Sequence, residues 1–182
     1  GSEMCIRDRW NHISALENYD RPEIAAEELP ADAYRDDVAA NLAVAERWVT
    51  EHSDTEFDFF LPPYSILFWD KVIREGRTEA VFAAIRQAGQ TLLQYDNVKF
   101  YGYLMDPEIV TNLDNYCDYI HHSGGVCREI LAMLQREEGR LTEENLEETL
   151  ANWREFVVHY DYDQFWDERF WIQWNAEHAA AP

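Results

Sequence analysis

One carboxylate and one imidazole in this sequence have the spacing that proton transfer requires. Asp118 and His121 lie in a polar stretch, residues 112–123. On one turn of irregular backbone, this spacing lets the carboxylate bond one imidazole nitrogen while the other nitrogen faces a substrate or a nucleophile. Such a carboxylate fixes the tautomer of the ring and stabilises the imidazolium that forms. The pair predicts a general base, His121, oriented by Asp118. The alternative is a plain role in a loop or helix cap.

No serine is well placed to be activated by this base. None of the five serines follows a predicted strand as a nucleophile elbow would: Ser2, Ser14, Ser53, Ser65 and Ser123. Ser65 comes directly after two prolines at a strand end, so we predict that it positions the substrate, with a role as an alternative nucleophile left open. Its structural alternative is to cap a helix that begins at Ile66. Tyr64 is predicted to line the substrate pocket or else to pack.

A metal site is the rival chemistry in the same region. Good ligand types gather within eleven positions: Cys117, Asp118, His121, His122 and Cys127. Adjacent histidines point in different directions on most backbones, and no Cys-x-x-Cys or His-Glu-x-x-His pattern is present. The sequence therefore predicts no metal and no cofactor. With three cysteines in all, we expect reduced thiols, with one disulfide bridge left open.

Two strands and several helices must position these residues. Apolar spacings of three and four predict helices, and short aromatic runs predict strands. The order helix, strand, helix, strand favours an α/β sandwich with a parallel sheet. Ligands then collect at the carboxyl ends of strands, in the loops after Leu61 and Leu104. The predicted helices cover residues 30–52, 66–75, 78–95, 126–135 and 142–159, and the predicted strands cover 56–61 and 98–104.

Three short blocks in this order resemble the C-terminal portion of SGNH-like, or GDSL-type, α/β hydrolases. The blocks are residues 59–65, 97–99 and 112–116, and the last leads to Asp118 and His121. The group that they resemble is related to the D-alanine transfer protein of teichoic acid modification. The resemblance implies a flavodoxin-like three-layer sandwich with a parallel sheet. It also implies an esterase or acyltransferase that acts on small-molecule or carbohydrate acyl esters of the cell envelope, with His121 as base and Asp118 as its partner.

The sequence departs from that group where the nucleophile belongs. It contains no Gly-Asp-Ser block and no Gly-x-Asn block. We therefore expect an incomplete domain that is inactive as a fragment, with the upstream half lost by truncation, or else a degenerate relative. Residues 1–9 resemble an adapter sequence. The expected organisation is an irregular segment over residues 1–29, the SGNH-like domain over 30–159 and an aromatic, acidic tail over 160–182.

Composition excludes one class of partner. The 182 residues include 36 acidic and 15 basic side chains, which gives a net charge of −21. Nucleic acid binding rests on clustered Lys and Arg, so we expect no nucleic acid partner. No apolar run is long enough to span a bilayer, although an upstream anchor stays open. The resemblance alone suggests a cell-envelope location.

The tail supplies a second hypothesis about function. Its rings could stack on sugars or on a partner protein, which would make the chain a non-catalytic acidic binding module. The alternative is that the tail forms an amphipathic helix whose rings pack. The rings concerned are Tyr160, Tyr162, Phe165, Trp166, Phe170, Trp171 and Trp174.

Overall fold

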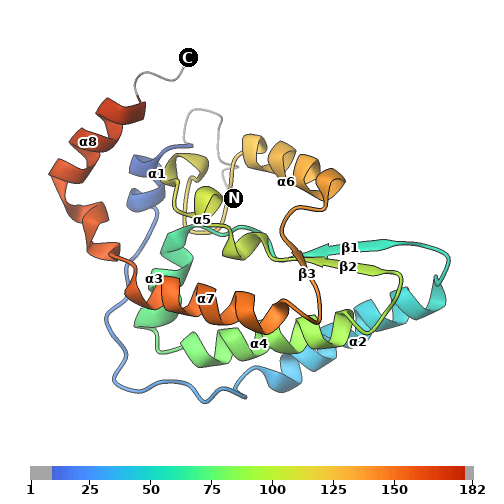
Figure 1. Ribbon diagram of the computed structural model, residues 1–182. Helices are drawn as coiled ribbons and strands as arrows, with labels where there is room; N and C mark the ends of the chain where they lie inside the picture. The colour runs from blue at the N-terminus through green and yellow to red at the C-terminus, as the bar shows by residue number, and fades with distance from the viewer. Residues whose placement is uncertain (1–9, 179–182) are drawn as a thin grey trace, which may run out of the picture.

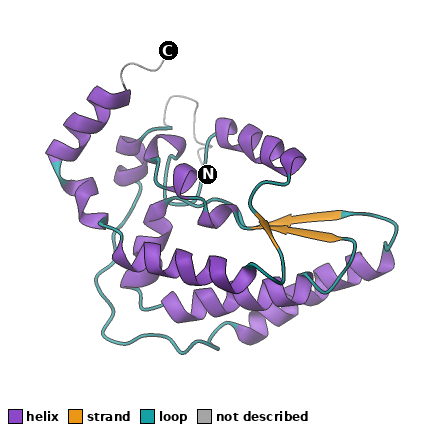
Figure 2. Cartoon of the chain, in the orientation of Figure 1, coloured by secondary structure: helices purple, strands orange, loops and turns teal. Residues whose placement is uncertain are grey.

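The computed structural model describes residues 10–178, and the predicted artefactual segment 1–9 lies outside them. Helices account for 59% of the described residues and strands for 7% (Figures 1 and 2). The helices are α1 (His12–Glu17), α2 (Arg35–Glu51), α3 (Ile66–Arg74), α4 (Thr78–Leu92), α5 (Pro107–Val110), α6 (Gly124–Arg136), α7 (Leu146–His159) and α8 (Glu168–His178). The strands are β1 (Phe57–Phe60), β2 (Val98–Tyr101) and β3 (Arg140–Leu141), and the short 3-10 helices are η1 (Tyr103–Met105), η2 (Leu113–Asn115) and η3 (Tyr162–Trp166).

The sheet is small and mixed, in the order β1-β2-β3. Strands β1 and β2 are parallel, with Phe57 beside Val98, and they are joined by a crossover through α3 and α4. Strand β3 then pairs antiparallel to β2, with Leu141 beside Phe100. Both longer strands lie inside the ranges predicted from the sequence.

The two faces of the sheet are covered differently. Successive side chains of a strand point to opposite faces. Val98 and Phe100 join the large core with α4 and α7, whereas Tyr101 packs in a separate cluster with Val126 and Ile130 of α6. Figure 1 shows α2, α4 and α7 on one side of the sheet and α6 on the other. The molecule therefore has a main core and a smaller second core beneath α6.

The predicted flavodoxin-like sandwich is wrong. The crossover from β1 to β2 gives a single parallel pair, and the described residues contain no further parallel strand. After Tyr101 the chain runs through 3-10 turns and short helices instead of a third apolar strand. The prediction extended one correct strand–helix–strand unit to a whole domain. Helices then cover the surfaces that additional strands would have occupied.

An extended segment between α1 and α2 ties the start of the chain to the turn after α3. The amides of Ala25 and Leu29 donate hydrogen bonds to the carbonyls of Arg74 (2.6 Å) and Gly76 (2.7 Å). Gly76 has a φ of +64°, and a Cβ there would lie 2.5 Å from the carbonyl oxygen of Glu27. Only glycine fits this close approach.

A buried ion pair fastens the same segment to the main core. Asp70 is 2% exposed and accepts hydrogen bonds from the Tyr19 hydroxyl (2.9 Å) and from Nε (2.8 Å) and Nη2 (3.0 Å) of Arg21. Arg21 also donates to Asp163 (2.7 Å) and lies 4.1 Å from the ring centre of Trp166. The pairing raises the pKa of the Arg21 guanidinium. It joins α3, the N-terminal segment and η3.

The aromatic tail packs against the body. Phe165 is buried, the Trp171 ring stacks on His12 at 3.8 Å, and the Trp174 indole donates to Asp114 (3.1 Å). Asp114 also accepts from the backbone amide of His12 (2.9 Å) and lies 2.8 Å from its Nδ1. Within residues 10–178, no helix has both the length and the apolar character needed to cross a bilayer.

Candidate functional site

The predicted acid–base pair is assembled on an exposed loop that precedes α6. Asp118 Oδ2 lies 2.6 Å from Nδ1 of His121, and Asp118 Oδ1 accepts the backbone amides of Ile120 (2.8 Å) and His121 (2.7 Å). The His121 side chain is 63% exposed and that of Asp118 is 22% exposed. The carboxylate therefore holds the turn together as well as the ring. The predicted catalytic role of the pair stays a prediction.

Ser65 and Tyr64 lie close to this loop but are engaged in packing. Ser65 is fully buried, and its hydroxyl donates to the carbonyl of Tyr119 (3.0 Å). It precedes α3 without making the capping hydrogen bond that the sequence suggested. Tyr64 packs against Phe68, with ring centres 5.1 Å apart. Substrate positioning by either residue stays a prediction.

The candidate metal ligands do not converge. His122 Nδ1 and Cys127 Sγ are 3.7 Å apart. Cys117, however, is in a disulfide, the alternative that the sequence left open, and Cys127 is free. Within residues 10–178, no three side chains of His, Cys, Asp or Glu are grouped so as to hold a metal ion.

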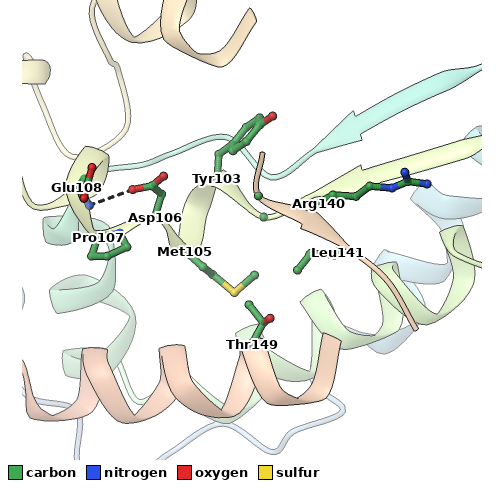
Figure 3. Close-up of a pocket in the computed structure, with 10 residues that line it drawn as sticks. Tyr103, Met105, Asp106, Pro107, Glu108, Arg140, Leu141 and Thr149 are labelled. Carbon is green, nitrogen blue, oxygen red and sulfur yellow. Dashed lines mark hydrogen bonds between the residues drawn. The ribbon is translucent and has the colours of Figure 1, made fainter. Parts of the chain in front are cut away.

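A cavity of about 340 Å³ opens where the chain leaves β2 (Figure 3). Its walls come from η1, α5, β3 and α7. Figure 3 shows Met105, Leu141 and Thr149 grouped on one side and Asp106 on the other. The lining residues are Gly102, Tyr103, Met105, Asp106, Pro107, Glu108, Gly139, Arg140, Leu141 and Thr149.

A second cavity, of about 450 Å³, shares Asp106 and Glu108 with the first. It lies between α5 and α6. Volumes of this size suit small molecules, and such sites form where strand connections diverge at the end of a sheet. We call the two together the joined cavities. The second is lined by Asp106, Glu108, Ile109, Asn115, Gly125, Val126, Glu129, Met133 and Glu138.

Asp106 is the fixed polar group between the joined cavities. Its Oδ1 accepts the amides of Glu108 (3.0 Å) and Ile109 (3.2 Å), and Pro107 occupies the first turn of α5. Pro at that position has a φ suited to a helix start, so the sequence Asp-Pro-Glu fixes the carboxylate. Arg140 extends away from the cavity in Figure 3 and donates to Glu137 (2.7 Å). Negative charge therefore dominates the lining.

Two buried tyrosines beside the cavities have no hydrogen-bond partner for their hydroxyls among residues 10–178. Tyr101 and Tyr103 are both 0% exposed, and Tyr103 lines the first cavity. Burial raises the pKa of both phenols, that of Tyr103 to about 12. Both hydroxyls therefore keep their protons at neutral pH.

Sequence reasoning named the loop after Leu104 as a ligand site but none of the residues that line the cavity there. The signals that could have indicated them were weak: the Asp106-Pro107 helix start and the glycine at position 139. The remaining walls come from β3 and α7, far along the chain. Their approach depends on how the elements pack.

The chain is similar to curated proteins whose names refer to an ACT domain and not to a hydrolase. It is 24% identical over 90 residues to a UPF0735 ACT domain-containing protein of Lacticaseibacillus casei and, to the same extent, to one of Lacticaseibacillus paracasei. The match covers 50% of this chain and 62% of each relative, so the chain spans less than two thirds of their length. No protein-family model matches the chain, and no solved structure matches it significantly.

These findings correct the predicted family and function. The relatives are ACT domain-containing proteins, and nothing indicates an SGNH hydrolase. The predicted esterase or acyltransferase is therefore wrong. Its blocks were short, and the Asp118–His121 spacing occurs by chance in many loops. The alternative was a non-catalytic module whose tail faces a glycan or a partner. Trp171 of that tail packs on α1 and Trp174 contacts η2, which argues against this alternative.

Proposed function

We propose that this chain is a regulatory, ACT-like domain that binds a small molecule in the joined cavities. The observation that carries the proposal is the pair of cavities, about 340 and 450 Å³, that meet at Asp106 and Glu108. The similarity to ACT domain-containing proteins supports a regulatory role. Apolar walls with a few fixed polar groups are typical of sites that recognise small ligands.

The lining favours binding over acyl-transfer chemistry. Neither cavity is lined by His or Cys, and Thr149 provides the one aliphatic hydroxyl. Nucleophilic catalysis needs a nucleophile in hydrogen-bond reach of a base. The Asp106 carboxylate accepts the two amides that start α5, which gives it a structural task already. A bound molecule would therefore be recognised and released unchanged.

The charge of the lining limits the ligand. Asp106 and Glu108 lie where the cavities meet, and Glu129 and Glu138 lie beside α6. The acidic groups repel anions, an effect that the net charge of −21 strengthens. Met105 and Leu141 supply apolar contact on the other side. We expect a ligand that is neutral or carries a positive group, with an apolar part.

Thermal unfolding with four probes tests this function. The probes are putrescine, L-methionine, glucose and citrate, which are cationic, zwitterionic, neutral and anionic. We expect at least one of the first three to raise the Tm in a concentration-dependent way, because a ligand that binds the native state stabilises it by mass action. Citrate should leave the Tm unchanged.

A cavity-filling variant shows where binding occurs. Thr149→Phe places a ring in the first cavity and should remove the shift in Tm. The matched control is Glu148→Phe, which adds the same ring to an exposed position of α7. The proposal fails if none of the first three probes shifts the Tm, if citrate alone shifts it, or if the shift survives Thr149→Phe.

A further inference from the structure

Helix α6 packs on a core of its own. Its residues Val126, Ile130 and Met133 form a cluster with Tyr101, Tyr103 and Ile109, separate from the main core. Figure 1 shows α6 on the opposite side of the sheet from α2, α4 and α7. A small separate cluster buries little apolar surface, so its helix can open without unfolding the rest.

On the buried side of this cluster, two tyrosine hydroxyls form no hydrogen bond with any described residue. The rings of Tyr101 and Tyr103 stack at 5.7 Å, and neither hydroxyl has a hydrogen-bond partner in the part of the chain that the structure describes. Buried hydroxyls normally find a partner, and one without it favours any state in which it meets one. Tyr116, which is equally buried in the main core, donates to the carbonyl of Pro63 (2.7 Å).

Both ends of α6 suit a hinge. The helix begins with Gly124 and Gly125. It ends at Arg136 and is followed by Glu137, whose φ of +54° is the one positive value for a non-glycine residue within residues 10–178. Gly139 comes next but one, with a φ of +72°. Glu137 is anchored by Lys99 (2.7 Å) and Arg140 (2.7 Å). Movement about this anchored end would carry the first turns of α6 away from α5.

We infer that α6 is a lid over the hydroxyls of Tyr101 and Tyr103, and that lifting it extends the second cavity to them. Val126 and Met133 face both this cavity and the tyrosine cluster, so displacing them joins the two spaces. The phenols stay protonated and donate, so the newly opened part takes a hydrogen-bond acceptor. The acidic side chains that line the second cavity disfavour an anion, so this acceptor is water or the oxygen of an uncharged ligand. The ligand part of the inference rests on the proposed function, whereas the lid does not.

Hydrogen exchange on the full chain, without ligand, tests the lid. We expect amides in the middle of α6 to exchange faster than those of α4 and α7, and independently of global unfolding. The double variant Tyr101→Phe and Tyr103→Phe removes the two hydroxyls and so stabilises the closed state. Exchange in α6 should then slow by roughly fivefold or more.

Tyr116→Phe is the matched control, because it removes a hydroxyl that has a partner. It should speed exchange across the main core and leave α6 no slower. The lid is wrong if α6 exchanges only together with α4 and α7 in the unaltered protein. The role of the hydroxyls is wrong if the double variant leaves the exchange of α6 unchanged. If none of the four probes binds, the proposed function fails while these results stand.

Discussion

The main core and the cluster beneath α6 differ in whether their buried polar groups have hydrogen-bond partners. In the main core, Asp70 is bonded by Tyr19 and Arg21, and the Tyr116 hydroxyl donates to a carbonyl. Beneath α6, the hydroxyls of Tyr101 and Tyr103 have no hydrogen-bond partner among the described residues. Trp153 is an exception in the main core, since its indole nitrogen is also buried without one.

Because of this difference, we expect the main core to stay closed and the cluster beneath α6 to open. A satisfied polar network rigidifies the elements that it joins, and a buried group without a partner weakens the state that buries it. The joined cavities lie along the boundary between the two regions, with walls from α7 of the main core and from α6. A ligand there would contact a fixed wall and a movable one.

The largest expected effect comes from breaking the ion pair between Asp70 and Arg21. We call the main core, with the hydrogen bonds and ion pairs that satisfy its buried polar groups, the paired region. Arg21→Ala leaves the Asp70 carboxylate buried without its cation. Among the described residues, the Tyr19 hydroxyl is then its remaining hydrogen-bond donor. Removing one partner of a buried ion pair costs about 3 kcal/mol or more. We expect the free energy of unfolding, measured by urea denaturation, to fall by that amount.

The control is Arg154→Ala, which breaks an exposed pair with Glu79 (2.6 Å). Exposed pairs contribute at most about 1 kcal/mol. Equal losses for the two variants would mean that the main core does not depend on the buried pair, and the contrast with α6 would then disappear.

Local patterns in the sequence predicted the elements better than the architecture. The aromatic runs that contain residues 57–60 and 98–101 and the helical spacing of residues 126–135 and 142–159 depend on near neighbours. These elements are confirmed, although the last helix begins at Leu146. The sheet order depends on which strands meet. β3 has only two residues, so no periodicity in the sequence could indicate its pairing with β2.

The candidate site was less predictable than the fold. The Asp118–His121 hydrogen bond needed only a short turn, which spacing can indicate, but spacing says nothing about a cavity. The first cavity joins residues 102 to 149 through the packing of α7 against the sheet. Hydroxyls without a partner leave no trace in a sequence, because a buried tyrosine normally has one.

An effect of intermediate size is expected when a tyrosine is replaced by phenylalanine, once in the main core and once beneath α6. Tyr116→Phe removes a buried hydrogen bond and leaves the Pro63 carbonyl unpaired, so we expect a loss of about 1 kcal/mol in the free energy of unfolding. Tyr103→Phe removes a hydroxyl that has no partner, so stability should stay equal or rise by up to about 1 kcal/mol. Urea denaturation measures both. A loss for Tyr103→Phe as large as that for Tyr116→Phe would show that its hydroxyl is satisfied.

The smallest expected effect concerns Asp114. It tests whether the paired region extends to α8. Burial acts to raise the pKa of Asp114, but hydrogen bonds from the amide and ring of His12 and from Trp174 outweigh it, so the pKa lies below its ordinary value of 3.8. A carboxyl with a lowered folded-state pKa stabilises the protein above its unfolded-state pKa. That contribution is lost as the pH falls through the folded-state value.

Asp114→Asn should therefore lower stability at neutral pH and converge on the unaltered protein in acid. Unfolding by urea at about pH 7 and at about pH 2.5 measures the difference, which should shrink toward the lower pH. Asp36→Asn, at a side chain that is 98% exposed, is the control and should show little difference at either pH. A constant difference for Asp114→Asn would mean that shape, and not charge, joins α8 to α1. The paired region would then end at η3 and would not include α8.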